Sequence, residues 1–161
     1  TLGVIGAGNI SRRIMACAAF FNMDVLCWTA HPEKHPEVLT LGARFSELQE
    51  LVKTSDVISV NLPNNAGTRG LVSEGLVSQM KDSCVFISVS RSDTVDYGAL
   101  FKKAAECPGF YVCLDLDPDS RIIEAIPDQP NVLVTPHIAG GTLETRKRMF
   151  CEAAEAASAL F

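Results

Sequence analysis

The chain has 161 residues, of which 47% are hydrophobic and 20% charged, a size and composition typical of one globular domain and too small for two. Nineteen acidic residues against fourteen basic ones give a formal net charge of -5, so no global positive field exists to hold a nucleic acid. No apolar run approaches the roughly 20 residues of a membrane span, and no signal peptide precedes the first predicted strand. We therefore expect a soluble, cytoplasmic protein with no nucleic-acid or membrane partner.

Six cysteines lie scattered through apolar segments and form no C-x-x-C pair. We interpret them as small buried hydrophobic residues in a reducing compartment, in preference to disulfides or zinc ligands. They are Cys17, Cys27, Cys84, Cys107, Cys113 and Cys151.

Apolar runs of strand length alternate with amphipathic segments of helix length along the whole chain. Strands are predicted at residues 2–5, 24–28, 57–61, 84–89, 111–116 and 132–135, and helices at 10–21, 45–54, 73–80, 97–107 and 143–160. Several strands are continuously apolar, which is typical of parallel strands covered by helices on both faces. The order predicts an α/β fold with a doubly wound parallel sheet of about six strands, which binds ligands at the carboxyl ends of its strands.

The last predicted helix carries an apolar stripe at helical spacing, formed by Met149, Phe150, Ala153, Ala154, Ala157 and Leu160. Two alternatives remain open for this stripe. It packs on the sheet of this domain, or it faces a further domain that is absent from this chain.

A glycine-rich loop directly follows the first strand and opens the first helix, with the sequence Gly3-Val-Ile-Gly-Ala-Gly-Asn-Ile-Ser-Arg12. Gly6 permits the tight turn, Gly8 allows the backbone to approach a pyrophosphate, and the helix N-terminus supplies free N–H groups. This is the pattern of a dinucleotide-binding loop. The third glycine of the pattern is replaced by Ser11, which we expect to loosen the packing of the helix on the strand.

The end of the second strand lacks the carboxylate that accepts hydrogen bonds from the ribose of NAD, and it lacks an arginine for the 2′-phosphate of NADP. Thr29 stands at this position, with His31, Lys34 and His35 close by in the sequence. The choice between NAD and NADP is left open by these residues.

Over nearly its whole length the chain resembles the D-isomer-specific 2-hydroxyacid dehydrogenases. The matching segments are SDVISVNLP at 55–63, TRGLV at 68–72, VFISVSRSDTVD at 85–96, LDL at 114–116 and NVLVTPHIAGG at 131–141. This ordered set is far more specific than the glycine loop alone. The resemblance implies that the chain is the Rossmann cofactor domain over residues 1–161, inserted in the family into a separate substrate domain that is absent here.

The same resemblance implies two catalytic side chains. Arg91, after the strand predicted at 84–89, is expected to grip the carboxylate of a 2-oxo acid, a two-pronged contact that suits arginine better than lysine. His137, after the last strand, is expected to protonate the carbonyl oxygen as a general acid.

The glutamate that orients this histidine in the family is missing, because Ser120 stands at its place. Asp117, Asp119 or Glu124 is left to substitute for it, and we assign the role to Asp119. The resemblance further implies that Asp115 faces the nicotinamide carboxamide or its ribose, and that Ser92, where the family has glycine, tightens or strains the turn after Arg91. The residues assigned to cofactor binding are Gly6, Gly8, Asn9, Ile10, Thr29, Asn61, Leu62, Pro63, Val89, Ser90, Arg91, Asp115, His137 and Gly140.

The leading hypothesis is the cofactor domain of an oxidoreductase that transfers a hydride between NAD(P)H and a small 2-oxo acid or D-2-hydroxy acid. The alternative is a dehydrogenase-like NAD(H) sensor or co-regulator that has kept the nucleotide cleft and lost turnover. We expect a homodimer, with Leu71, Val72, Leu76 and Val77 of the segment 66–80 exposed at a two-fold contact. The isolated segment is expected to bind dinucleotide weakly and to show negligible turnover.

Overall fold

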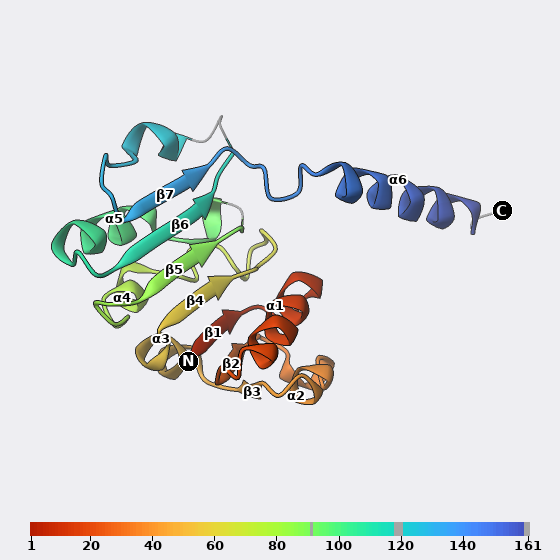
Figure 1. Ribbon diagram of the computed structural model, residues 1–161, viewed down its shortest axis with the longest axis horizontal. Coiled ribbons are helices and arrows are strands. Elements are labelled where there is room, and N and C mark those ends of the chain that lie inside the picture. Colours follow the sequence, from red (N-terminus) through yellow and green to blue (C-terminus); the bar gives the residue numbers. More distant parts are fainter. Residues whose placement is uncertain (91, 118–120, 160–161) are drawn as a thin grey trace.

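The computed structural model describes residues 1–90, 92–117 and 121–159 (Figure 1). Within them lies one seven-stranded sheet in the order β3-β2-β1-β4-β5-β6-β7, in which every pair of neighbours is parallel. The strands are β1 (Leu2–Ile5), β2 (Val25–Trp28), β3 (Arg44–Phe45), β4 (Val57–Val60), β5 (Val85–Ser88), β6 (Tyr111–Asp115) and β7 (Val132–Thr135). The predicted α/β doubly wound parallel sheet is confirmed, with one strand more than expected.

The additional strand, β3, lies where the sequence predicted the start of a helix. Arg44 and Phe45 pair with Leu26 and Cys27 of β2 at the edge of the sheet. Two residues are too few to show an alternating pattern, so residue patterns cannot predict this strand. The helix begins later, at Leu48.

The helices are α1 (Asn9–Phe20), α2 (Glu37–Thr40), α3 (Leu48–Thr54), α4 (Glu74–Val77), α5 (Tyr97–Glu106) and α6 (Leu143–Ser158). Short 3₁₀ turns lie at η1 (Pro32–Lys34), η2 (Ser92–Thr94) and η3 (Arg121–Ala125). All five predicted helices are present, and the short α2 was not predicted. No helix in the described part of the chain is long and apolar enough to cross a bilayer.

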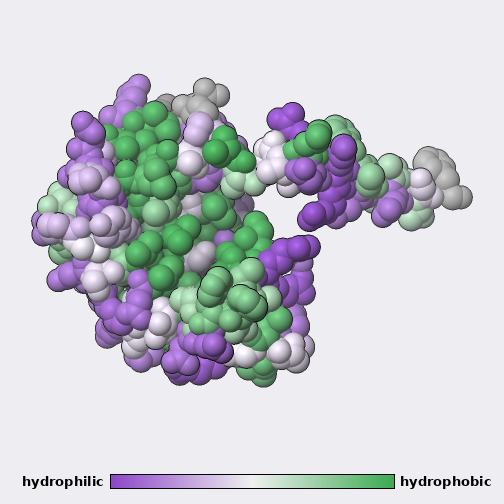
Figure 2. Space-filling view, viewed as in Figure 1, coloured by the Kyte–Doolittle hydropathy of each residue, from purple (hydrophilic) through white to green (hydrophobic). Residues whose placement is uncertain are grey.

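The two faces of the sheet are covered to different extents. On one face α3, α4 and α5 pack on the strands in a large apolar cluster, around side chains such as Ile58, Phe86 and Val112. On the other face α1 covers β1 and β2 through Met15 and Ala18, in a smaller cluster. The remainder of that second face is open over β6 and β7, where Leu133 is 63% exposed, and Figure 2 shows apolar residues at the surface there.

Helix α6 has no buried residue and extends away from the sheet (Figure 1). Phe150 on its apolar stripe is 77% exposed. Of the two alternatives for this stripe, packing on the sheet of this domain is therefore not what the structure shows.

The surface expected to form a dimer contact is not available. Val72, Leu76 and Val77 are buried in the large apolar cluster, and Leu71 is half-buried against it. The prediction that these side chains are exposed is wrong. Leu76 and Val77 of α4 face the large apolar cluster, and Val72, which precedes α4, forms a parallel bridge with Val95 inside that cluster.

The cysteines divide into three environments, and all six are free thiols. Cys27 and Cys84 are buried as expected, while Cys107 and Cys113 are half-buried. Cys17 and Cys151 are exposed, so the expectation of burial is wrong for these two. Cys17 lies on the solvent-facing side of α1, and Cys151 lies on α6, which buries no residue.

Candidate active site and nucleotide cleft

A cavity of about 1050 Å³ borders the carboxyl ends of the central strands. Strand β1 pairs with β2 on one side and with β4 on the other, which is the switch point where doubly wound sheets bind ligands. Seven residues assigned to the cofactor line this cavity, namely Asn9, Ile10, Asn61, Val89, Asp115, His137 and Gly140. The structure thus brings residues from five separate segments, at the carboxyl ends of β1, β4, β5, β6 and β7, to one cavity.

A second cavity of about 270 Å³ adjoins the first, since both are lined by Val89, Asp115 and His137. Ser90 and Asp117 also line it. His137 therefore stands at the boundary between a large cavity and a small polar one, which is the place that a proton donor needs between a cofactor and a substrate.

The loop after β1 can be built only with glycine at position 6. Gly6 has a φ of +107°, and a Cβ atom there would lie 2.5 Å from the carbonyl oxygen of Asn61. The close approach joins the loop after β1 to the loop after β4, with the Asn61 N–H also donating to the Ile5 carbonyl at 2.9 Å.

Gly8 has a different reason to be small. It is the N-cap of α1, its φ is ordinary at −74°, and a Cβ atom there would meet nothing within 4 Å. The space in front of the first turn of α1 is therefore open to a ligand, and the free N–H groups of that turn favour an anion.

Ser11, in place of the third glycine, is fully buried between α1 and the sheet. Its hydroxyl has no hydrogen-bond partner among the residues that the structure describes. The expected loosening of the helix is not seen, because α1 still packs on β1 and β2 through Met15 and Ala18.

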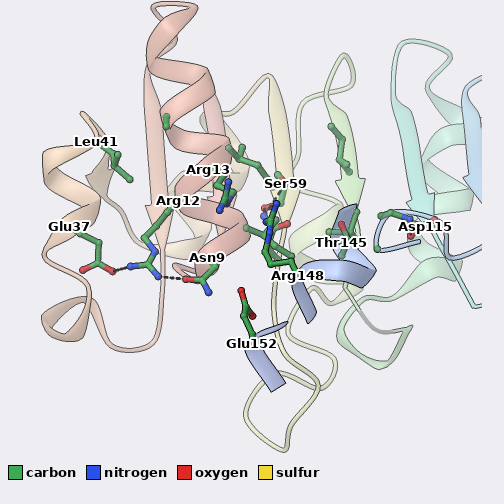
Figure 3. Close-up of a pocket in the computed structure, with 18 of the residues that line it drawn as sticks. Asn9, Arg12, Arg13, Glu37, Leu41, Ser59, Asp115, Thr145, Arg148 and Glu152 are labelled. Atoms are coloured by element: carbon green, nitrogen blue, oxygen red, sulfur yellow. Dashed lines mark hydrogen bonds and ion pairs between the residues drawn. The ribbon is translucent and has the colours of Figure 1, made fainter. Parts of the chain in front are cut away.

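A polar network covers the side of the cavity formed by α1 and α2 (Figure 3). The Arg12 guanidinium donates to Glu37 Oε1 at 3.1 Å and to Asn9 Oδ1, and His35 Nδ1 lies 3.3 Å from the same Glu37 oxygen. A backbone hydrogen bond at Glu37 makes the largest contribution to lowering the pKa of its carboxyl, with further contributions from His35 and Arg12. Glu37 is thus an anion held between two basic side chains.

Ser90 links the ends of β4 and β5. Its hydroxyl accepts from the Leu62 N–H at 2.8 Å and donates to the Val60 carbonyl at 3.0 Å. Ser90 is buried, and Leu62 packs against the large apolar cluster. Both residues, together with Pro63, were assigned to the cofactor, and the structure shows Ser90 and Leu62 shaping the loop that carries Asn61.

Asp115, the last residue of β6, is paired in register with Thr135 of β7. Its carboxylate accepts from the Thr135 hydroxyl at 2.5 Å and from the Ile138 and Ala139 N–H groups at 2.9 Å each. His137 lies within this turn and has a left-handed φ of +52°, a conformation that is uncommon for a residue with a Cβ atom.

Thr29 does not line the large cavity. It borders a separate cavity of about 540 Å³ at the ends of β2 and β3, together with Trp28, Ala30 and Pro32. A carboxylate does line this third cavity, but it comes from Glu47, the N-cap residue of α3.

Two residues assigned to catalysis, Arg91 and Asp119, lie outside the described residues, as does Ser120. Of the other two candidates for the missing glutamate, Asp117 is exposed and lines the small cavity with His137. Glu124 is exposed on η3 and lines none of the three cavities.

Comparison with known proteins agrees with this geometry. The family model described as "D-isomer specific 2-hydroxyacid dehydrogenase, NAD binding domain" matches residues 1–139. The chain belongs to this family.

Two curated members of the family illustrate the degree of similarity. A glyoxylate reductase of Aeropyrum pernix is 33% identical over 163 residues, which covers 96% of this chain and 47% of that protein. A hydroxypyruvate reductase of Thermotoga maritima is 30% identical over 159 residues, with 96% and 51% covered. The chain thus spans about half the length of these relatives.

A solved structure of the family has the same fold. The D-lactate dehydrogenase of Aquifex aeolicus, complexed with NAD and lactic acid, superposes with a TM-score of 0.82 at 31% identity. The match covers 99% of this chain and 52% of that one.

The residues of this NAD-binding domain fit a dinucleotide. Open space in front of Gly8 leaves room for a pyrophosphate at the N-terminus of α1. Asn61 Oδ1 is a buried acceptor on the lining of the large cavity, without a hydrogen-bond partner in the described part of the chain. A buried acceptor of this kind favours a ligand that brings a donor.

The sequence analysis missed several residues that border the large cavity, namely Arg12, Arg13, Glu37, Arg148 and Glu152. Arg12 and Arg13 follow the glycine loop by one turn of helix, so their place on the nucleotide side of α1 could have been inferred. The positions of Glu37, Arg148 and Glu152 depend on the unpredicted α2 and on where α6 projects, and no local pattern contains that information.

Proposed function

We propose that the protein to which this chain belongs transfers a hydride between NAD(P)H and a small 2-oxo acid or D-2-hydroxy acid. The observation that carries the proposal is the position of His137, between the large cavity with its glycine loop and the small polar cavity. Support also comes from the relatives reported above, which are described as reductases and dehydrogenases, and none of them as a sensor.

On the nucleotide side, the loop of Gly6 and Gly8 and the first turn of α1, with Asn9 and Ile10, would hold the pyrophosphate. Asn61, Val89 and Gly140 line the remainder of the large cavity, where the nicotinamide half would lie. The dinucleotide supplies the hydride when it is bound. Side chains of this domain orient it and exclude water from its reactive face.

On the substrate side, His137 would donate a proton to the carbonyl oxygen as the hydride arrives. Arg91 would bind the substrate carboxylate through both of its prongs, which requires a guanidinium. Asp119 would orient His137 in place of the family's glutamate. Asp117 has support of its own, because it lines the small cavity together with His137.

The experiment is an absorbance assay at 340 nm on the full-length protein with NADH and glyoxylate, hydroxypyruvate or pyruvate. We expect reduction of at least one of them, and about 100-fold slower reduction by His137→Ala with nucleotide affinity nearly unchanged. Arg91→Lys should mainly weaken productive binding of the oxo acid. If the full-length protein binds NADH and reduces none of a panel of 2-oxo acids, the oxidoreductase proposal is wrong and the alternative of an NAD(H) sensor takes its place.

For nucleotide choice, we propose that affinities for NADH and NADPH differ by no more than about tenfold, or 1.4 kcal/mol. Thr29 neither repels a 2′-phosphate nor attracts it, so Thr29→Asp should shift the preference towards NADH. Fluorescence quenching of Trp28 measures both affinities. Strong native selectivity for NADH that disappears in Glu47→Gln would assign the discrimination to Glu47 instead.

We also propose that residues 1–161 act as one domain in a cytoplasmic homodimer. Six free thiols are compatible with a reducing compartment. Phe20 and Phe21 at the end of α1 stack edge to face and are 82% and 71% exposed, so apolar surface remains for a contact although 66–80 does not provide it. Light scattering should give a dimer mass at tens of micromolar, and a monomer would contradict this.

A further inference from the structure

We infer that Asp115 is a positioning residue whose carboxylate builds the turn that presents His137 to the two cavities. This role differs from the contact with nicotinamide or ribose that the family resemblance implies for Asp115. The catalytic consequence rests on the proposed function of His137, while the structural part can be tested without any nucleotide.

The geometry of the turn supports this role. Asp115 Oδ1 accepts from the Thr135 hydroxyl and from the Ile138 N–H, while Oδ2 accepts from the Ala139 N–H. The donors lie on both sides of His137 in the sequence. One side chain therefore fixes the chain before and after the histidine.

The turn needs such a restraint. His137 has a φ of +52°, which a residue with a Cβ atom adopts only where its surroundings enforce it. The His137 N–H itself donates to the Thr135 carbonyl two residues back, at 3.0 Å. Hydrogen bonds to an ionised carboxylate are shorter and stronger than neutral ones, so Asp115 is suited to enforce the conformation.

Asp115 is ionised at neutral pH. Partial desolvation raises the pKa of its carboxyl, but the hydrogen bonds from Thr135, Ala139 and Ile138, with the nearby His137, outweigh it and leave the pKa below the ordinary value. An ionised carboxylate has about four acceptor sites, and three are already occupied here. Little capacity remains for a nucleotide.

The test is an NMR comparison of the 161-residue chain with Asp115→Asn. In the native chain we expect a strong intraresidue HN–Hα contact at His137, which marks a left-handed φ, and slow amide exchange at Ile138 and Ala139. In Asp115→Asn that contact should weaken, and exchange at both amides should speed up at least tenfold. Amides of Val112 and Leu114 in β6 report whether the sheet is intact, and Asp128→Asn, at an exposed aspartate before β7, is the matched control.

Native-like exchange at Ile138 and Ala139 in Asp115→Asn would overturn the inference. If the sheet amides of that variant also lose their protection from exchange, two milder variants at Thr135 provide the test instead. Thr135→Ser keeps the hydroxyl and should behave as the native chain, whereas Thr135→Val should speed exchange at Ile138 about threefold. Equal exchange in the two variants would also overturn the inference.

Kinetics of the full-length protein separate this role from nucleotide binding. Asp115→Asn should lower kcat at least tenfold and leave the KM for NADH within twofold. A raised KM for NADH with kcat unchanged would assign Asp115 to the nucleotide and contradict the positioning role. Absence of any native activity would count against the proposed oxidoreductase, while the NMR result would stand or fall separately.

Discussion

The two ends of the candidate site are held in place by different forces. At the nucleotide end, Gly6 and Asn61 directly follow β1 and β4, whose side chains are almost all buried in the two apolar clusters, so the loop is fixed by the packed core. At the histidine end, β7 lies at the edge of the sheet with one face open, and the turn after it is joined to β6 by the carboxylate of Asp115. Core packing therefore fixes the loop at the nucleotide end, while a few polar contacts fix the turn that carries His137.

The largest difference between the two regions should appear in stability. Phe86 of β5 is fully buried in the core, whereas Phe150 on α6 is 77% exposed. Phe86→Ala should lower the free energy of unfolding by about 3–5 kcal/mol, and Phe150→Ala should change it by less than about 0.5 kcal/mol. Urea denaturation followed by circular dichroism measures both. Equal losses of stability in the two variants would mean that α6 is packed in solution and would contradict the difference between the buried core and the exposed α6.

The next effect distinguishes two glycines of one loop. Gly6→Ala meets a positive φ and the Asn61 carbonyl at 2.5 Å, so it should destabilise the fold by about 1–3 kcal/mol. Gly8→Ala meets only open space and should leave stability unchanged while weakening NAD binding at least tenfold. Thermal unfolding and NAD titration of the two variants check this, and Gly75→Ala in α4 serves as the glycine control. A stable Gly6→Ala that binds NAD normally would refute the account of the loop.

Thiol reactivity should also differ between the buried core and the exposed helix surfaces. Burial raises the pKa of Cys27 and of Cys84 to about 12, and both side chains are inaccessible. Cys17 and Cys151 are exposed. A thiol reagent at pH 8 should therefore label Cys17 and Cys151 at least 100-fold faster than Cys27 and Cys84, with all six labelled together in urea. Mass spectrometry of timed aliquots identifies the sites, and fast native labelling at Cys27 would show that the sheet opens there.

The smallest effect is a pH dependence of the histidine turn. Because the pKa of Asp115 is lowered in the fold, the turn gains stability above the ordinary aspartate value of about 3.9 and loses it as the pH falls through the depressed pKa. Amide shifts of Ile138 and Ala139 should therefore move together as the pH falls below about 4. A midpoint of this change above pH 4 would contradict a carboxylate whose pKa is lowered by its hydrogen bonds.

Much of this architecture could be predicted from residue patterns, and the failures have physical causes. The glycine loop, six of the strands and the strand-end positions of Asp115 and His137 follow from local patterns that depend on a few neighbouring residues. The burial of Leu76 and Val77 depends on where α4 docks, and that of Val72 on its bridge to Val95, neither of which a local pattern specifies. The hydrogen bonds that Asp115 accepts in the turn around His137 could not be predicted either, because the donors at Ile138 and Ala139 are backbone N–H groups, which every residue but proline has.

The structure and its relatives indicate that this domain holds NAD over the loop after β1, at the switch point of the sheet. Titration of the ¹⁵N-labelled 161-residue chain with NAD, followed by amide chemical shifts, tests it most directly and detects weak binding. We predict saturable shifts at Gly8, Asn9 and Ile10, accompanied by Asn61 and Val89, with the amides of α6 beyond its first turn unchanged. The absence of shifts at the glycine loop up to millimolar NAD, or shifts confined to another surface, would contradict the account.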